Sequence, residues 1–396
     1  MRMPESVLMV LIITLSIFAP LSTDMFLPAL DEMVEFFGTD EATMSMTMYM
    51  FMLFLAIGIL LLGPVGDKYG RRNVLIGSLT VYIIASVACS MATNIWVMII
   101  FRIIQSIGAG GAMSTAVALI RDCFEGDKRS RVLTIVAVIG VLGPVAAPLL
   151  GQVLIWNLGW QSTFWTPAII AGVCMVMTIM LPGDIPKERY KGSILGAAGT
   201  VIPILKNGDF RRFTIMMNMV AFCILAYISV SEYIYKDKGF GVGDMYSVYL
   251  AAAMLIGVGL MLLINKLGSK MSNKTHLKVV FILVLFAVIV MWTVGDMHPM
   301  LFLVGVIPII TVSATARSFG FNILLAQDVG NSGAISSVLN FMNFMFATAG
   351  MIVVVNLPFD NYVMSVACCF TIYLVVFTVL WARMRFYGTS LKGLEK

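Results

Sequence analysis

The stretch Gly63–Leu75, GPVGDKYGRRNVL, interrupts an otherwise apolar part of the chain. Its first ten positions hold one acid, three bases, three glycines and a proline. Apolar runs flank it at about 43–63 and 74–92, and each is long enough to cross a bilayer as a helix, which takes about 20 residues. A polar segment between two such runs is expected at a membrane surface, where it turns the chain from one spanning helix into the next.

The composition of the whole chain supports this interpretation. Of the 396 residues, 60% are hydrophobic and 12% are charged, and the mean hydropathy is +0.97. A soluble domain carries roughly a quarter charged residues, so a water-soluble globule is excluded. The apolar runs lack the strict alternation of barrel strands, and backbone groups in lipid must be paired within their own segment. The chain is therefore predicted to be an all-α integral membrane protein.

Further runs of the same kind follow along the chain, and together they predict twelve transmembrane helices. The expected spans are 6–29, 43–63, 74–92, 95–120, 131–155, 163–182, 212–235, 245–266, 277–295, 299–325, 333–356 and 361–383.

The basic residues predict the orientation. Most of the 26 Lys and Arg residues lie in the two tails and in the links between spans 2–3, 4–5, 6–7 and 8–9. The link after the first span instead carries acids and no base; the acids are Asp31, Glu32, Glu35, Asp40 and Glu41. By the positive-inside rule both termini are expected in the cytoplasm. The net charge of +5 is thereby assigned to membrane topology, and nucleic-acid binding is not expected.

The chain divides into two similar halves. The longest polar interruption, 183–211, separates an N-terminal bundle, 1–182, from a C-terminal bundle, 212–396, with six spans each. The segment Asp67–Arg72 is echoed by Asn265–Lys270, in the corresponding link of the second half. Such a repeat is typical of transporters whose substrate site lies between the two halves near the bilayer midplane.

Three segments resemble motifs of the major facilitator superfamily. Residues 63–72 are similar to its loop 2–3 signature, which implies a latch on the cytoplasmic side made by Gly63, Asp67, Gly70, Arg71 and Arg72. Residues 101–110, FRIIQSIGAG, resemble its helix-4 motif, with Ser106 where glycine is usual. Residues 140–151, GVLGPVAAPLLG, resemble its antiporter motif, carried here by Gly140, Gly143, Pro144, Pro148 and Gly151.

The surrounding sequence narrows the resemblance. TDMFLPAL at 23–30, IRDCF at 120–124 and the region of Trp160 and Trp165 are similar to the bicyclomycin/chloramphenicol-resistance branch of twelve-helix exporters. That resemblance implies a monomeric multidrug exporter of a bacterial inner membrane, driven by exchange with protons through alternating access. It implies small-molecule substrates and no cofactor.

Four ionisable residues fall inside predicted spans, where a charge is costly and usually functional: Asp24, Arg102, Glu232 and Arg317. A rise of about 1.5 Å per residue places Asp24 and Arg102 at similar depths in helices 1 and 4. The resemblance implies that Asp24 carries the proton and that Arg102 adjusts its affinity. A permanent ion pair that only fixes the two helices is the alternative. Related exporters carry a second acid where this chain has Ser16, and Glu232 is a candidate replacement or a solvated vestibule residue.

The remaining candidates line the expected cavity. Arg317 would attract an anionic substrate group, or else extend to the inner surface as an ordinary terminal arginine. Polar, aromatic or flexible side chains in other spans complete the expected lining: Tyr49, Met52, Asn218, Tyr227, Asn340 and Asn343.

Enzymatic chemistry is not expected. The six cysteines and two histidines lack metal-ligand spacing, and neither a phosphate-binding loop nor a nucleophile with its base can be recognised. The leading hypothesis is a proton-coupled exporter of small amphiphilic compounds. The alternative is a dedicated exporter of one zwitterionic or anionic metabolite, such as a metallophore or a small peptide. An importer is disfavoured by the antiporter motif, and a non-transporting receptor has no need for the repeated latch.

Overall fold

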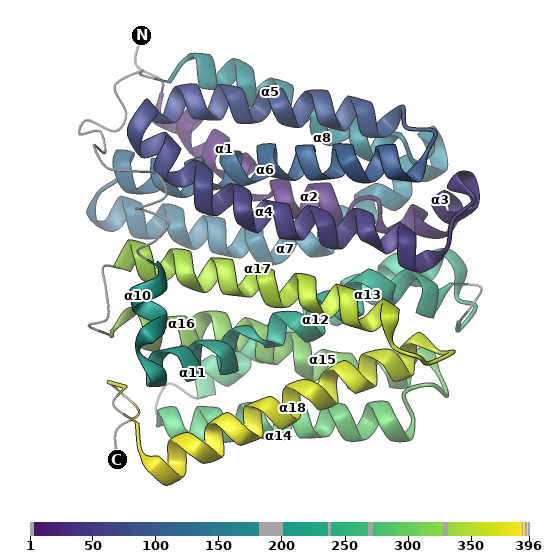
Figure 1. Cartoon of the computed structure of the whole chain (residues 1–396), viewed down its shortest axis with the longest axis vertical. Helices are drawn as coiled ribbons and strands as arrows, with labels where there is room; N and C mark the ends of the chain where they lie inside the picture. The colour runs from purple at the N-terminus through teal and green to yellow at the C-terminus, as the bar shows by residue number, and fades with distance from the viewer. Residues whose placement is uncertain are drawn as a thin grey trace. The chain divides into compact units, whose positions relative to one another are not determined.

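A computed structural model describes residues 4–181, 201–236, 239–267, 272–327 and 332–389, together with 391, 392 and 394. The described residues form helices and short turns, with no strand among them. The chain separates into two compact units, Met1–Ala198 and Gly199–Lys396 (Figure 1).

The described part of the first unit contains eight α-helices and one 3₁₀ turn, η1 (Leu27–Ala29). The helices are α1 (Glu5–Ser16), α2 (Phe18–Thr23), α3 (Leu30–Phe37), α4 (Glu41–Tyr69), α5 (Arg71–Ser90), α6 (Ile95–Cys123), α7 (Gly126–Leu158) and α8 (Ser162–Ile179). Helix α6 is central, because α4 and α5 both pack along it. Small residues permit this close approach: a Cβ atom on Gly110 would lie 2.9 Å from the backbone of α4.

The second unit begins with α10 (Val201–Lys206), α11 (Gly208–Asn218) and α12 (Val220–Tyr235). It continues with the turn η2 (Gly243–Met245), α13 (Tyr246–Leu267), α14 (Asn273–Thr293), α15 (Pro299–Thr315), the π-helical segment η4 (Ala316–Gly320), α16 (Phe321–Leu325), α17 (Ser332–Asn356) and α18 (Tyr362–Tyr387). Helix α12 packs against α15, α17 and α18. A Cβ atom on Gly350 of α17 would lie only 2.0 Å from the carbonyl oxygen of Phe222, so glycine is required for that contact.

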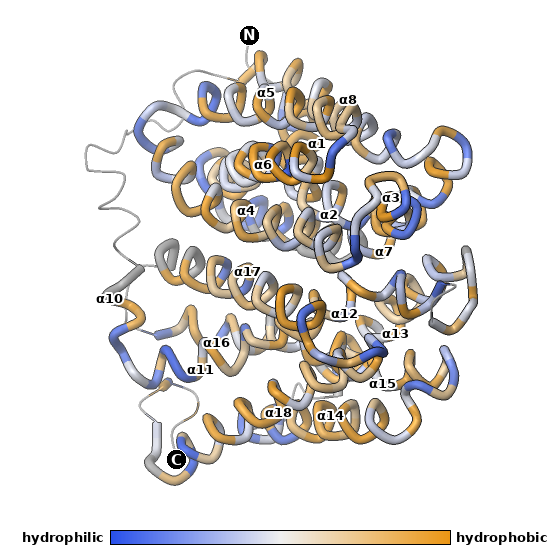
Figure 2. Tube along the Cα trace, turned by 45° about the vertical axis from the view of Figure 1, so that its right-hand side comes forward, coloured by the Kyte–Doolittle hydropathy of each residue, from blue (hydrophilic) through white to orange (hydrophobic). Residues whose placement is uncertain are grey.

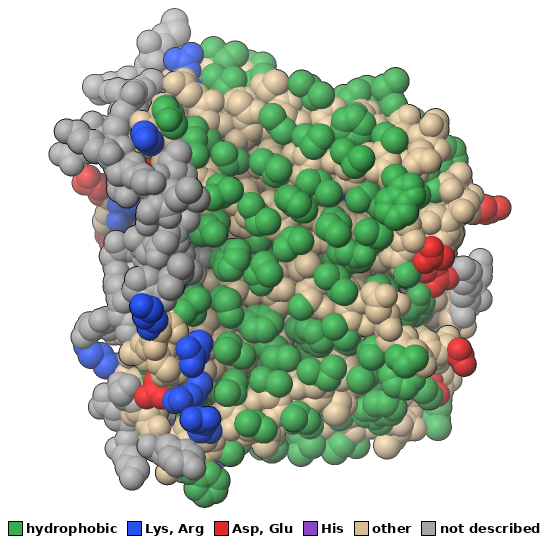
Figure 3. All heavy atoms as spheres, viewed as in Figure 1, with side chains coloured by type: hydrophobic (Ala, Val, Ile, Leu, Met, Phe, Trp, Pro, Cys, Tyr) green, Lys and Arg blue, Asp and Glu red, His purple; other side chains and the backbone are tan. Residues whose placement is uncertain are grey.

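The described helices occupy the twelve predicted spans. Nine are long and apolar enough to cross a membrane, a bent pair formed by Glu5–Ser16 and Phe18–Phe37 counts as a tenth, and the apolar helices Gly143–Leu158 and Pro299–Thr315 lie at two more expected positions. Figure 2 shows hydrophobic residues along the helices and hydrophilic residues near their ends. On the face shown in Figure 3, Lys and Arg side chains gather at one end of each unit.

Three of the predicted spans are not regular helices. The seventh, 212–235, is interrupted at Met219, between α11 and α12. The first span was expected to be continuous over 6–29, but it bends by 44° after Ser16, and α2 ends at Thr23. Pro20 and Pro28 lack the amide hydrogen that a continuous helix needs, which favours breaks here. The tenth span, 299–325, changes to π-helix at 316–320, where an extra residue is accommodated in one turn.

The two ends of the predicted linker differ. Residues 201–206 and 208–211 belong to α10 and α11, whereas 183–200 lie outside the described residues. The second polar segment is Asn265–Lys270. Its positions 265–267 form the C-terminal end of α13, and 268–270 lie outside the described part.

Candidate functional site

The break in the first span determines the position of Asp24. This residue is the C-cap of α2, and only 5% of it is exposed. The Thr23 hydroxyl donates a hydrogen bond of 2.8 Å to Asp24 Oδ1. The carboxyl group is therefore held at a helix end, inside the first unit, next to two residues of non-helical backbone.

Glycines of α7 support the broken segment on either side of Asp24. A Cβ atom on Gly151 would lie 1.8 Å from the carbonyl oxygen of Met25, and one on Gly143 would lie 3.2 Å from the ring of Pro20. Gly140 has no such neighbour among the described residues. Pro144 and Pro148 lie within the same helix, between these contacts. Two of the three antiporter-motif glycines thus permit α7 to approach the segment that carries the acid.

Arg102 lies in α6 and is fully buried. Its Nη1 donates to the carbonyl oxygen of Ser22 at 2.8 Å and to Oε1 of Gln105 at 2.7 Å, and its Nε donates to the carbonyl oxygen of Thr47 at 3.2 Å. Three aromatic rings surround the guanidinium at 4.3, 4.7 and 5.7 Å from its central carbon: Phe51, Phe26 and Phe164.

The ion pair considered between Asp24 and Arg102 is not formed. Instead, the guanidinium caps the carbonyl end of α2, where the helix dipole is negative, and the π faces of the three rings add attraction. The Nη2 atom of Arg102 is buried and has no hydrogen-bond partner within the described ranges. The cation is thus stabilised by dipoles and rings, and one of its donors is left unused.

A polar network extends from Arg102 across the unit. Gln105 Nε2 donates to Ser86 Oγ at 2.7 Å, and Ser22 Oγ lies 2.6 Å from the hydroxyl of Tyr82. The network joins α2, α5 and α6, and the Arg102–Thr47 bond adds α4. Neither Tyr82 nor Gln105 was singled out in the sequence, although polar residues inside apolar spans were a signal for them.

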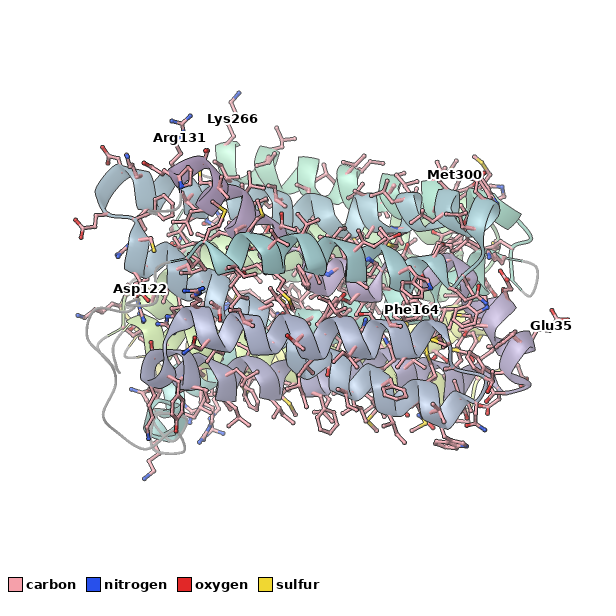
Figure 4. The ribbon with its side chains drawn as sticks, turned by 90° about the horizontal axis from the view of Figure 1, so that it is seen from above. Glu35, Asp122, Arg131, Phe164, Lys266 and Met300 are labelled. Atoms are coloured by element: carbon pink, nitrogen blue, oxygen red, sulfur yellow. The ribbon has the colours of Figure 1, made fainter. Side chains whose placement is uncertain are left out.

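A cluster of charges surrounds Arg71, the first residue of α5, which is 1% exposed. Arg71 makes a close ion pair with Asp67, a second with Asp122 at 2.9 Å, and a hydrogen bond of 3.3 Å to the carbonyl oxygen of Gly63. Arg121 contacts the same two carboxylates at 3.3 and 3.1 Å. The cluster ties the α4 end to the α6 end, and Figure 4 shows Asp122 at this end of the unit.

The charge cluster contains residues of α6 as well as the residues that the sequence predicts as a latch. Asp122 and Arg121 belong to the IRDCF segment, which resembled the exporter branch but was not assigned to the latch. Gly70 has φ +98° and makes the turn between α4 and α5. Arg72, in contrast, is partly exposed and forms no ion pair with a described residue.

In the second unit, Glu232 is completely buried, so it is not a solvated vestibule residue. Its Oε1 lies 2.6 Å from Nζ of Lys236, one helical turn further on. Tyr227 is also buried, 5.8 Å from the ring of Phe302, and Asn218 donates to the carbonyl oxygen of Thr214 at 3.0 Å.

The other expected cavity residues are more scattered. Met52 is buried, Tyr49 and Asn343 are partly exposed, and Asn340 is exposed on α17. Arg317 lies in the π-helical segment η4, and its side chain lies outside the described atoms. Among the side chains that the structure describes, no contact joins these residues into one site.

Comparisons with known proteins give the family. The model of the Major Facilitator Superfamily matches residues 12–354. An uncharacterized MFS-type transporter of Bacillus subtilis, YdgK, is 25% identical over 342 residues, which are 84% of this chain and 85% of that protein. The multidrug resistance protein MdtL of Escherichia coli is 32% identical over 162 residues, 41% of each chain.

Solved structures agree at the level of the fold. The peptide transporter POT has a TM-score of 0.77 with 12% identity, covering 98% of this chain and 96% of its own. A D-xylose–proton symporter has a TM-score of 0.73 with 14% identity, covering 99% of each chain. The family match extends over most of the chain and the fold agrees with it, so the protein belongs to the Major Facilitator Superfamily of membrane transporters.

Proposed function

We propose that the protein is a proton-coupled antiporter of the bicyclomycin/chloramphenicol-resistance branch, which exports small amphiphilic compounds by alternating access. The observation that carries the proposal is the buried carboxyl group of Asp24. It lies at a break in the first span, between two glycine contacts from α7 and two residues beyond the carbonyl group that Arg102 holds.

The proton step follows from this geometry. With a proton bound, Asp24 is neutral and can stay beside Thr23 without a cationic partner. When the proton leaves, the carboxylate needs a positive partner at this depth, and the unused Nη2 of Arg102 provides one. Pairing with Asp24 would draw Arg102 from the carbonyl end of α2, so that loss of the proton changes how the first span is held.

The charge cluster around Arg71 supplies the second element of the mechanism. Arg71 is buried and shares two carboxylates with Arg121, so the ends of α4 and α6 are joined in the state described here. Separating these ends in the other access state exchanges protein contacts for water. We assign this cluster to the cytoplasmic face of a bacterial inner membrane, because Lys and Arg gather at its end of the unit (Figure 3).

The substrate class rests on the relatives. A curated relative is named a multidrug resistance protein, and the match covers 41% of its length. A wide range of apolar compounds suits a chain with 31 methionines, because flexible thioether side chains adapt to many ligand shapes. The proton gradient is the proposed energy source, with no cofactor and a monomer as the working unit.

The test uses proteoliposomes with an imposed pH gradient and three compounds: cationic tetraphenylphosphonium, neutral chloramphenicol and an anionic dye. Wild-type protein is expected to exchange protons for at least one of them, and Asp24→Asn to abolish the gradient-driven component. Asp40→Asn, outside the span, is the matched control, because asparagine also caps a helix. Gradient-driven transport at the wild-type rate in Asp24→Asn would contradict the proposal.

One observation favours a second candidate function. An unused, buried guanidinium donor attracts a carboxylate or phosphate, so Arg102 Nη2 also fits a dedicated exporter of an anionic or zwitterionic metabolite. In that case, a strain lacking the protein would fail to secrete one native compound, and the three test compounds would not be transported.

A further inference from the structure

The carboxylate of Glu232 lies near the C-terminal end of α12, paired with the protein's own Lys236. Glu232 is 0% exposed, whereas the Lys236 side chain keeps 16% of its surface in contact with solvent. The Nζ–Oε1 distance is 2.6 Å. Lys236 is the C-cap of α12, and its amide donates to the carbonyl oxygen of Glu232 at 2.8 Å.

This pair is poorly explained as a stabilising contact. The C-terminal end of a helix carries a partial negative charge, which disfavours an acid there. The cost of removing two charges from water also offsets most of the attraction between them. Apolar residues of similar size often stabilise the folded state at least as much as a buried ion pair does. Lys236 alone would supply the positive charge that is favourable at the C-terminal end of a helix. The buried carboxylate therefore needs another reason.

Aromatic rings are concentrated around the same helix end. The ring of Tyr235 stacks on Tyr249 at 5.1 Å, and Phe302, Phe240 and Tyr246 lie 5.5, 6.1 and 6.3 Å from it. Tyr235 is three residues after Glu232, so the two share a helix face. Phe302 lies in the first turn of α15, as does Met300, which Figure 4 labels.

Two hydroxyl groups here leave polar capacity unused. Those of Tyr227 and Tyr235 are buried without a hydrogen bond to a described residue, whereas the hydroxyl of Tyr246 accepts one from Ser231 at 3.2 Å. A buried carboxylate beside electron-rich rings is the combination that binds an organic cation, because the carboxylate offsets the charge and the rings contact the apolar substituents.

We propose that Glu232 is the binding site for the charged group of a lipophilic organic cation, and that Lys236 occupies this site as a tethered competitor. An arriving cation displaces the ammonium group of Lys236, which returns to water on its flexible stem. One positive charge replaces another, so the carboxylate is never left buried without a partner. The inference rests on the proposed export function, and it names the substrate class at a site separate from Asp24.

The test measures binding of tetraphenylphosphonium to the purified full chain in detergent, without a pH gradient. Lys236→Gln removes the competitor and should tighten binding roughly tenfold, which corresponds to about 1.4 kcal/mol. Glu232→Gln should abolish this binding, and the double variant should behave like Glu232→Gln. Lys278→Gln, which removes an exposed lysine of α14, is the charge-matched control and should bind like the wild type. Equal or weaker binding by Lys236→Gln would overturn the proposal.

A second measurement avoids the risk that Lys236→Gln leaves a buried charge and fails to fold. In the wild-type chain, tetraphenylphosphonium should increase the labelling of Lys236 by an amine-reactive reagent at least severalfold, because the ammonium group is released to solvent. Unchanged or reduced labelling at saturating cation would refute the displacement. Failure of the proposed function gives a different result. In that case chloramphenicol, which is neutral, would show no Asp24-dependent transport in proteoliposomes, while tetraphenylphosphonium would still bind to the chain in detergent.

Discussion

The contact between Gly151 and the broken first span leads to a sharp prediction. In Gly151→Ala, the new Cβ atom would lie 1.8 Å from the carbonyl oxygen of Met25. Because Cβ atoms essentially never approach other heavy atoms within 3.0 Å, the backbone at Met25 must shift by at least the missing 1.2 Å. The obstructing atom belongs to the backbone, so no side-chain rotation can relieve the contact.

The expected effects are large on transport and moderate on stability. Overpacking of this kind costs about 1–3 kcal/mol. Because 1 kcal/mol shifts the midpoint of thermal unfolding by about 2–4 °C in a unit of this size, the midpoint should fall by roughly 2–12 °C. Met25 follows Asp24 directly, so the carboxyl group moves with it. A displacement of about 1 Å can reduce the rate of a positioned chemical step about 100-fold. Gradient-driven export should therefore fall much more than the amount of folded protein.

Gly172→Ala in α8 is the matched control, because its Cβ would meet no described atom within 4 Å and it lies outside the antiporter motif. It should leave export unchanged and raise stability by up to about 1 kcal/mol, since alanine favours a helix more than glycine does. Both variants are compared by export in proteoliposomes and by thermal unfolding in detergent. If Gly151→Ala exports and unfolds like Gly172→Ala, the close support of the first span by α7 is refuted.

Three further predictions concern the ends of the helices. Arg71→Met should lower stability by about 3 kcal/mol in the same unfolding assay, because it leaves two carboxylates beside each other. Arg72→Met should change stability by less than about 0.5 kcal/mol, because Arg72 is partly exposed. Equal effects of the two substitutions would contradict the argument that the burial of Arg71 matters. Hydrogen bonds from the side chain and backbone of Thr43 hold the pKa of Asp40 below its usual range. The stabilisation by this cap is therefore fully present above the usual aspartate pKa of about 3.9 and is lost as the pH falls through the lowered value, so Asp40→Ala should destabilise at pH 7 but not in strong acid. In Gln327→Leu, two hydrogen bonds of 3.2 and 3.0 Å between the Gln327 side chain and the backbone of Lys392, in the C-terminal tail, are lost. Carboxypeptidase should then remove the tail several times faster than in the wild type, and an unchanged rate would show that the tail is held by other contacts.

Much of the fold could be predicted from local sequence alone. Hydropathy over about 20 residues located the spans, and the family match over 12–354 confirmed the resemblance to the major facilitator superfamily. Polar residues in apolar surroundings also indicated positions that are buried in the structure, namely Asp24, Arg102 and Arg71. Such signals are local, because the cost of a charge in lipid depends on the segment that contains it.

The partners of these residues could not be predicted in the same way. Arg102 donates to carbonyl groups 80 and 55 positions away, and Arg71 pairs with Asp122 over 51 positions. The break after Thr23 exposes the carbonyl end that Arg102 caps, and nothing in the hydropathy of the span indicates that end. The roles of Asp24, Glu232 and the cavity residues remain predictions that the transport experiments above address.

The sequence by itself determined that this chain is a membrane transporter of helical spans, because burial in lipid is decided by the apolar content of each segment. Only the tertiary structure decided that Arg102 is held by a helix end and three rings, that Gly151 supports the break beside Asp24, and that Lys236 covers Glu232. The physical reason is distance dependence: hydrogen bonds, cation–π contacts and glycine-permitted approaches act over a few ångströms. They exist only once helices far apart in the chain have packed together.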